Sequence, residues 1–322
     1  MRYIGLHKQQ ARNNFRSVVL LCLFPCLVIL LTLLFSSLMT SVTSSGFGNA
    51  TWEKTKPMFW SIAPLALTGV AIWFLIAYFA NTAIIRKATG ARPLERRENM
   101  RVYNMVENLC MSQGMTMPKV NVIENSSLNA FASGINDKTY TVSLTRGIIN
   151  HLNNDELEGV IAHELAHIRN RDVRLLIVSI VFVGIFAVLA QLAFRSLLYA
   201  PRINRRSNGK GGAIVMIVII LIALFVAAIG YFFATLMRFA ISRKREYLAD
   251  AAAAEMTRNP MALASALRKI SRNPNIASVT RDDIAQLFIE HPRPKNNFFS
   301  AFLGLFATHP PIKKRITILE QF

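Results

Sequence analysis

Four stretches without a charged residue constrain this chain more than any other feature of its sequence. They run over residues 17–38, 58–85, 175–194 and 211–237. A helix of about 20 apolar residues crosses a hydrocarbon layer of about 30 Å, and a segment in lipid must satisfy its own backbone hydrogen bonds. The sequence therefore predicts a multi-pass membrane protein with four transmembrane helices.

The rest of the chain divides into a short amino-terminal segment, residues 1–16, and two polar blocks, residues 86–174 and 238–322. The first pair of predicted spans lies within residues 17–85, and the second pair forms a hairpin over residues 175–237. Together the two polar blocks have the size of one ordinary domain. We therefore expect them to form a single domain across the hairpin.

The net charge of +19 comes largely from basic residues that cluster beside the predicted spans. Such clusters are typical of headgroup contact and cytoplasmic loops, and no basic, aromatic-rich module is present, so we expect no nucleic-acid partner. Residues 1–16 carry basic but no acidic side chains, which places this segment in the cytoplasm. Counting crossings then places both polar blocks there. The loop at residues 195–210 is also basic, which leaves open whether the third and fourth segments span fully.

The string HELAH, from His163 to His167, places two histidines four residues apart. The preceding tract, NNDELEGVIA, predicts a helix that begins at Asn153 or Asn154, with acidic residues in its first turn. Residues four apart share a helix face, so both imidazoles reach one ion, with Glu164 beside them. A catalytic zinc site needs such nitrogen ligands, a third protein ligand, and a water whose proton a glutamate accepts.

A second candidate motif follows the fourth predicted span, where ISRKREYLADAAAAEM predicts a helix with Glu246 and Asp250 four residues apart. Zinc accepts carboxylate oxygen, and a ligating imidazole usually donates its other N–H to an outer carboxylate. We expect Glu246 to be the third ligand of one Zn²⁺ per chain, and Asp250 to orient an imidazole. The alternative is a surface ion pair between Glu246 and Arg243 or Lys244.

Three short segments, KVNVIEN, NAFASG and TYTVSLT, alternate like strands, with a hairpin between the last two. An exposed edge at Asn129, Ala130, Phe131 and Ala132 would bind an extended polypeptide substrate by backbone pairing. The alternative is a supporting sheet. His309, in ATHPP, is a candidate oxyanion donor or inhibitory fourth ligand, and otherwise a turn residue before proline.

Four motifs in order, LNAFASG, HELAH, SRKREYLAD and THPPIKKRI, resemble the HtpX-type integral-membrane zinc metallopeptidases, which are gluzincins related to the CAAX prenyl proteases. The resemblance covers nearly the whole chain. It implies a protease domain facing the cytoplasm, with zinc held by His163, His167 and Glu246 and with Glu164 as general base. It also implies a role in membrane-protein quality control under stress.

We therefore expect a mainly α protein with a small β-sheet, an α+β fold, in which four transmembrane helices accompany a zincin-like metalloprotease domain built from two chain segments. The predicted function is a zinc endopeptidase of the cell (inner) membrane that acts on misfolded or damaged membrane proteins. One alternative is a CAAX prenyl protease, which would have more than four spans. The other is a non-catalytic zinc-binding membrane scaffold, which would close the fourth position with Cys or His. The oligomeric state is left open.

Overall fold

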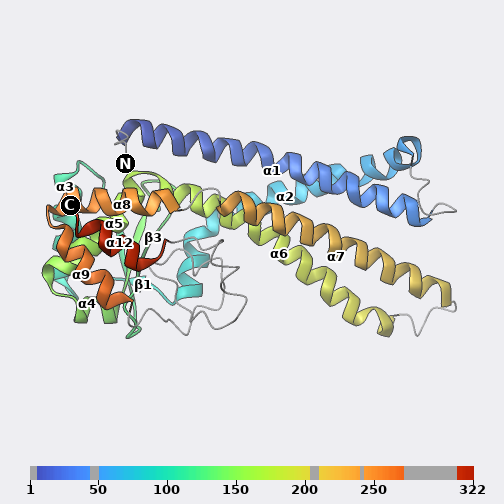
Figure 1. The fold of residues 1–322 in the computed structure, drawn as a ribbon. Helices are drawn as coiled ribbons and strands as arrows, with labels where there is room; N and C mark the ends of the chain where they lie inside the picture. The colour runs from blue at the N-terminus through green and yellow to red at the C-terminus, as the bar shows by residue number, and fades with distance from the viewer. Residues whose placement is uncertain (1–5, 44–50, 204–209, 240–242, 272–309) are drawn as a thin grey trace. The chain divides into compact units, whose positions relative to one another are not determined.

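The computed structural model describes residues 6–43, 51–203, 210–239, 243–271 and 310–322 (Figure 1). It is mainly helical with one small sheet, which confirms the predicted fold class. The chain divides into two compact units. The mixed unit comprises residues 1–17, 79–180 and 238–322, and the helical unit comprises residues 18–78 and 181–237. Both polar blocks therefore contribute to the mixed unit.

Four long helices run into the helical unit: α1 (Leu6–Thr43), α2 (Trp52–Thr89), α6 (Asp172–Ile203) and α7 (Lys210–Phe239). Among the described residues, three stretches are long and apolar enough to cross a membrane: Asn13–Ser41, Trp52–Ile76 and Asp172–Leu192. In α7 the described apolar stretch, Ile217–Phe233, is shorter. The chain is an integral membrane protein, and its fourth span stays a prediction.

Aromatic and aliphatic contacts fill the interior of the helical unit. The rings of Phe24 and Phe182 stack with their centroids 3.9 Å apart, and Trp73 Nε1 donates to the Val181 carbonyl at 3.3 Å. A cavity of about 520 Å³ is lined by apolar residues of all four helices, among them Val28, Gly69, Phe186 and Ala227.

One four-stranded sheet lies in the mixed unit, in the order β1-β2-β4-β3. Its strands are β1 (Arg92–Pro93), β2 (Lys119–Ile123), β3 (Ala130–Ser133) and β4 (Thr141–Thr145). Strand β4 pairs in parallel with β2 and antiparallel with β3, where Ala132 lies opposite Val142. The three strands predicted from the sequence are present. The unpredicted β1 ends in a proline, which an edge strand tolerates because no ladder bond is lost there.

The described residues of the mixed unit also form the helices α3 (Met100–Ser112), α4 (Arg146–His151), α5 (Asn154–Arg169), α8 (Arg243–Thr257), α9 (Pro260–Ile270) and α12 (Ile312–Leu319). Helix α5 contacts α3, α8, α9 and β3, and Figure 1 shows α5, α8 and α12 grouped beside β3. Six apolar residues of α5 are fully buried, namely Leu157, Val160, Ile161, Ala162, Leu165 and Ala166. A helix packed on so many sides carries its polar residues into the interior.

Candidate metal centre

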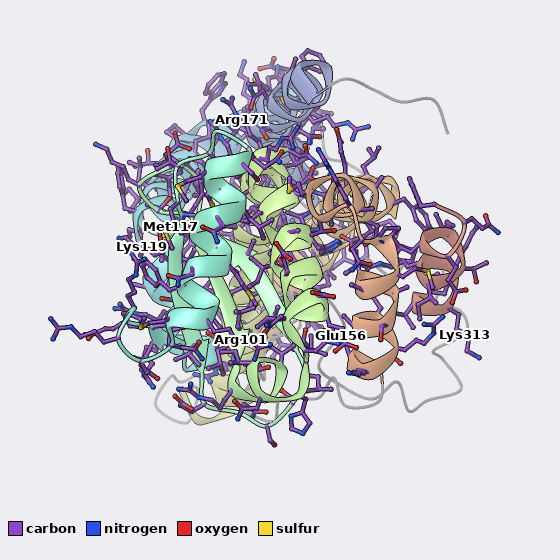
Figure 2. All side chains as sticks on the ribbon, turned by 90° about the vertical axis from the view of Figure 1, so that its left-hand side faces the viewer. Arg101, Met117, Lys119, Glu156, Arg171 and Lys313 are labelled. Atoms are coloured by element: carbon purple, nitrogen blue, oxygen red, sulfur yellow. The ribbon has the colours of Figure 1, made fainter. Side chains whose placement is uncertain are left out.

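Helix α5 begins with a capping box. Asn153 Oδ1 accepts the Glu156 N–H at 2.9 Å, and Glu156 Oε2 accepts the Asn153 N–H at 3.0 Å. The Glu156 carboxylate also accepts from Ser265 Oγ at 2.7 Å and from Lys269 Nζ at 2.6 Å, both on α9. Figure 2 shows Glu156 between α5 and helices of the second chain segment. The predicted helix start is confirmed at Asn153, and one buried carboxylate holds the two chain segments together.

His163 and His167 lie on one face of α5, with their Nε2 atoms 3.2 Å apart. Glu246, in the predicted helix α8, points its carboxylate at both rings. Its Oε2 is 3.8 Å from His163 Nε2, and its Oε1 is 3.6 Å from His167 Nε2. One ligand atom from each of the three residues lies within 4.8 Å of the others.

These separations suit a tetrahedral metal ion. Zinc bonds of roughly 2.0–2.2 Å at tetrahedral angles place ligand atoms roughly 3.3–3.6 Å apart, close to the distances between the three side chains here. Two imidazole nitrogens and one carboxylate oxygen are also a donor set that zinc uses in catalytic sites. The residues therefore fit the metal that the sequence predicts.

A carboxylate lies behind each imidazole. Asp250 Oδ1 is 3.0 Å from His163 Nδ1, and Asp172 Oδ2 is 3.2 Å from His167 Nδ1. Both carboxylate side chains are buried, with 3% and 2% of their surface exposed. A carboxylate at Nδ1 fixes the proton on that nitrogen and leaves Nε2 free to bind a metal. The sequence predicted this place for Asp250 but not for Asp172.

Asp172 reaches His167 because the chain breaks between α5 and α6. Helix α5 ends at Arg169, Arg171 has a φ of 60°, and α6 begins at Asp172. Five residues separate His167 from Asp172, a spacing that does not share a face within one helix. The sequence gives one signal for Asp172: it is an acidic residue shortly after the second histidine, at a place where a first-turn acid stabilises the start of a new helix.

Arg315 of α12 is a second residue that the sequence did not identify. Its side chain is 1% exposed, and its Nε and Nη2 donate to the two Asp250 oxygens at 2.8 and 2.7 Å. Nη2 also lies 3.3 Å from His163 Nε2, and Nη1 lies 3.6 Å from Glu246 Oε2. The bidentate ion pair between Arg315 and Asp250 places the guanidinium cation at the edge of a site that is otherwise acidic.

Glu164 is 2% exposed and interacts with the backbone of Ala132 in β3. Burial raises the pKa of Glu164 to about 7, and the charge of Glu246 adds to this rise while His167 opposes it. A carboxyl group whose pKa lies near neutral pH both accepts and returns protons readily.

The two histidines differ in their protonation. Burial lowers the pKa of His163 to about 4, although the hydrogen bond with Asp250 opposes this shift. Burial would also lower the pKa of His167, but the carboxylates of Glu246 and Asp172 outweigh it and raise the value to about 9. Without a metal, the extra proton on His167 therefore balances part of the negative charge of Glu246 and Asp172. A bound divalent cation would take over this role.

The remaining candidates are the β3 residues and His309. Within the described residues β3 is an edge strand, but Asn129, Ala130, Phe131 and Ala132 are at most 4% exposed. The strand lies beside α5 and Glu164, its side chains are buried, and the pairing of a substrate along it stays a prediction. His309 lies outside the described residues.

Comparison with known proteins gives three kinds of match. The model of Peptidase family M48 matches residues 96–322. A Protease HtpX homolog of Bacteroides fragilis is 62% identical over 325 residues, covering 100% of both chains. One of Dictyoglomus turgidum is 40% identical over 79% of this chain and 82% of its own. One of Streptococcus pyogenes is 33% identical over 98% of this chain and 99% of its own. The crystal structure of S. mikatae Ste24p aligns with a TM-score of 0.46 and 21% identity, covering 81% of this chain and 58% of that chain.

Proposed function

Because this chain belongs to Peptidase family M48 and is a membrane metallopeptidase, we propose that His163, His167 and Glu246 bind one zinc ion and that Glu164 is the general base. The observation that carries this proposal is the convergence of these three ligands from two chain segments. A set of two imidazoles and one carboxylate favours zinc over magnesium or calcium, which prefer oxygen ligands only.

The protein groups around the site have separate tasks in peptide hydrolysis. A bound metal ion supplies Lewis acidity, which lowers the pKa of a water and polarises the scissile carbonyl. Glu164 accepts a proton from the attacking water and returns it to the nitrogen of the leaving amine, so it ends each cycle as it began. Asp250 and Asp172 keep the Nδ1 protons of the two histidines in place throughout.

We propose that the substrates are membrane proteins with misfolded or damaged segments. The support is the position of the site along the chain: His167 precedes Asp172 by five residues, and the candidate span Asp172–Leu192 begins there. A polypeptide leaving the bilayer would meet such a site near the headgroups. The basic residues beside the spans support a multi-pass protein of the cell (inner) membrane with its protease domain in the cytoplasm.

The two alternatives are less well supported. The relatives are called Protease HtpX homolog, which favours a general protease over a prenyl-protein protease. A non-catalytic scaffold with a structural zinc site would not require a general base, so it does not account for Glu164, a buried carboxyl group whose pKa is raised to about 7.

Metal content and proteolysis, measured together on purified full-length protein, test the proposal. Glu246→Gln should lose the metal, because a first-shell anion is removed. Glu164→Gln should keep the metal and cleave an unfolded membrane protein about 10²–10⁴-fold more slowly, because the base is gone. Glu255→Gln on α8 and Glu158→Gln on α5 are matched controls that should change neither property.

Two results would contradict the proposal. Full metal content in Glu246→Gln would remove Glu246 from the ligand set. Undiminished cleavage by Glu164→Gln would remove Glu164 from the reaction.

A further inference from the structure

Helix α1 brings one side chain to the outer part of the metal site. Asn13 is 3% exposed, and its Nδ2 donates to Asp172 Oδ1 at 2.7 Å and to the Asn170 carbonyl at 2.9 Å. Because a carboxylate and a carbonyl accept hydrogen bonds, the nitrogen of the amide, and not its oxygen, must face them. Asn13 precedes Asp172 by 159 residues, so this contact ties two remote parts of the mixed unit together.

The two oxygens of Asp172 have different partners. Oδ2 faces His167 Nδ1 at 3.2 Å, and Oδ1 accepts from Asn13. Arg245 Nη1 donates to the backbone carbonyl of Asp172 at 3.1 Å and lies farther, at 3.9 Å, from Oδ1. The orientation of the carboxylate towards His167 is therefore set by what its other oxygen binds.

We propose that Asn13 is a positioning residue of the metal centre, which acts on His167 through Asp172. This inference rests on the proposed function, because it takes His167 to be a metal ligand. Asn13 holds Oδ1, so that Oδ2 stays in line with the imidazole and fixes the proton on Nδ1. The start of the first candidate span, Asn13–Ser41, is then part of the metal site.

Loss of the Asn13 amide leaves Oδ1 buried without its main donor, which is costly for a carboxylate. Arg245 is placed to replace the missing donor, since a small rotation of the carboxylate closes the 3.9 Å gap. The same rotation takes Oδ2 out of line with His167. The imidazole then loses the partner that raises its basicity, and the metal is held less tightly.

The neutral amide of Asn13 also differs from the partner of the other outer carboxylate. Asp250 is held by the guanidinium of Arg315, whose charge balances its own. Asn13 itself brings no charge. The guanidinium of Arg245 lies farther from Asp172 Oδ1, at 3.9 Å, than that of Arg315 lies from Asp250 Oδ1, at 2.7 Å, so more of the Asp172 charge acts on His167. The two ligating histidines thus have unequal support, and the ring next to Asp172 depends on a residue of α1.

Zinc affinity of the full-length protein in detergent, measured by titration against a competing chelator, tests the inference. Asp172→Asn should weaken binding about 10- to 100-fold, the usual range for an outer partner of a ligating histidine. Asn13→Ala should weaken it by about 10-fold, at the lower end of that range. Ser17→Ala is the matched control, because Ser17 is buried one turn away and its hydroxyl donates to the Asn13 carbonyl, not to Asp172. This control should bind zinc as the unchanged protein does.

A double variant separates positioning from general stabilisation. If Asn13 acts through Asp172, adding Asn13→Ala to Asp172→Asn should weaken binding no further, whereas independent effects would multiply. The visible spectrum of the Co²⁺-loaded protein, which reports ligand geometry, should change alike in both single variants. Asn13→Ser, whose hydroxyl is too short to reach Asp172, gives the same comparison if the alanine variant does not fold.

Unchanged zinc affinity and Co²⁺ spectrum in Asn13→Ala, or in Asn13→Ser, would overturn the inference. Multiplying effects in the double variant would also overturn it. The zinc content of Glu246→Gln distinguishes a failure of the proposed ligand set from a failure of the role proposed for Asn13. If that variant keeps its zinc, the proposed ligand set is wrong, and if it loses zinc while the Asn13 variants do not, only the role of Asn13 is wrong.

Discussion

Replacing Arg315 by methionine tests the most buried charge of the site. Arg315 and Asp250 have only 1% and 3% of their side-chain surfaces exposed, and two hydrogen bonds of 2.8 and 2.7 Å join them. Methionine keeps most of the apolar stem but removes the cation, so Asp250 is left as an unbalanced buried charge. Lys313→Met, on the exposed face of the same helix, is the matched control.

The size of the effect follows from this geometry. Each hydrogen bond to a charged group contributes about 1.5–3 kcal/mol, and breaking a buried ion pair from one side costs about 3–5 kcal/mol. We therefore expect Arg315→Met to destabilise the mixed unit by about 3–5 kcal/mol. Lys313→Met should stay within about 0.5 kcal/mol, as for most surface substitutions.

The loss should also depend on pH. Burial would raise the pKa of Asp250, but the charge of Arg315 outweighs it and lowers the value from 3.8 to about 2. In the unchanged protein this stabilisation is present above pH 3.8 and is lost as the pH falls towards 2. Without Arg315 the buried carboxyl takes up a proton at higher pH, which relieves the unbalanced charge. The difference between the two proteins should therefore narrow as the pH falls from 7 to 4.

Pulse proteolysis in urea, on detergent-solubilised protein with a chelator present, measures this difference without any contribution from metal. A loss of about 3–5 kcal/mol lowers the urea midpoint by about 1–3 M. The reasoning would be refuted if Arg315→Met unfolded at the same urea concentration as Lys313→Met. A difference that widened at low pH would refute the electrostatic part alone.

Three further predictions concern other parts of the chain. Asp250→Asn should weaken zinc binding about 10- to 100-fold in a chelator titration, because an amide lacks the charge that supports His163, and an affinity equal to that of Glu255→Gln would contradict this. Gly147→Ala should lower the urea midpoint clearly, because a Cβ there would overlap the Ser126 carbonyl oxygen, and an unchanged midpoint would show that the backbone next to α4 adapts. A cysteine at Asn136, or at Asn275 outside the described residues, should be protected from a membrane-impermeant reagent added outside intact cells, and labelling of either would disprove the cytoplasmic placement.

Local patterns in the sequence were enough to predict the helices that carry the three proposed metal ligands. The start of α5 follows from a cap and an acid three residues apart, and the ligand face follows from the spacing of two histidines. Glu246 was identifiable because a second helix carried carboxylates in the right spacing. These signals lie within a few residues of one another, which is why one sequence reveals them.

The outer partners of the site were not predictable in the same way. Asn13 and Arg315 lie 159 and 65 residues from the carboxylates that they bind. Arg315 lies in the THPPIKKRI motif, but nothing in that motif predicts that this residue, among 37 lysines and arginines, is buried. The burial of Asn13 and Arg315 depends on how segments remote in the sequence pack together. The burial of the β3 side chains was not predictable for the same reason, since a strand pattern does not say what packs beside it.

The chain makes the parts of its site at different times. His163 is synthesised 152 residues before Arg315, and both helices of the predicted membrane hairpin lie between them. At about 5–20 residues per second, the first ligand waits roughly 8–30 s for the cation that balances Asp250. The site cannot be complete before the hairpin has been made. A newly made copy therefore lacks part of the proposed site until α12 has been synthesised.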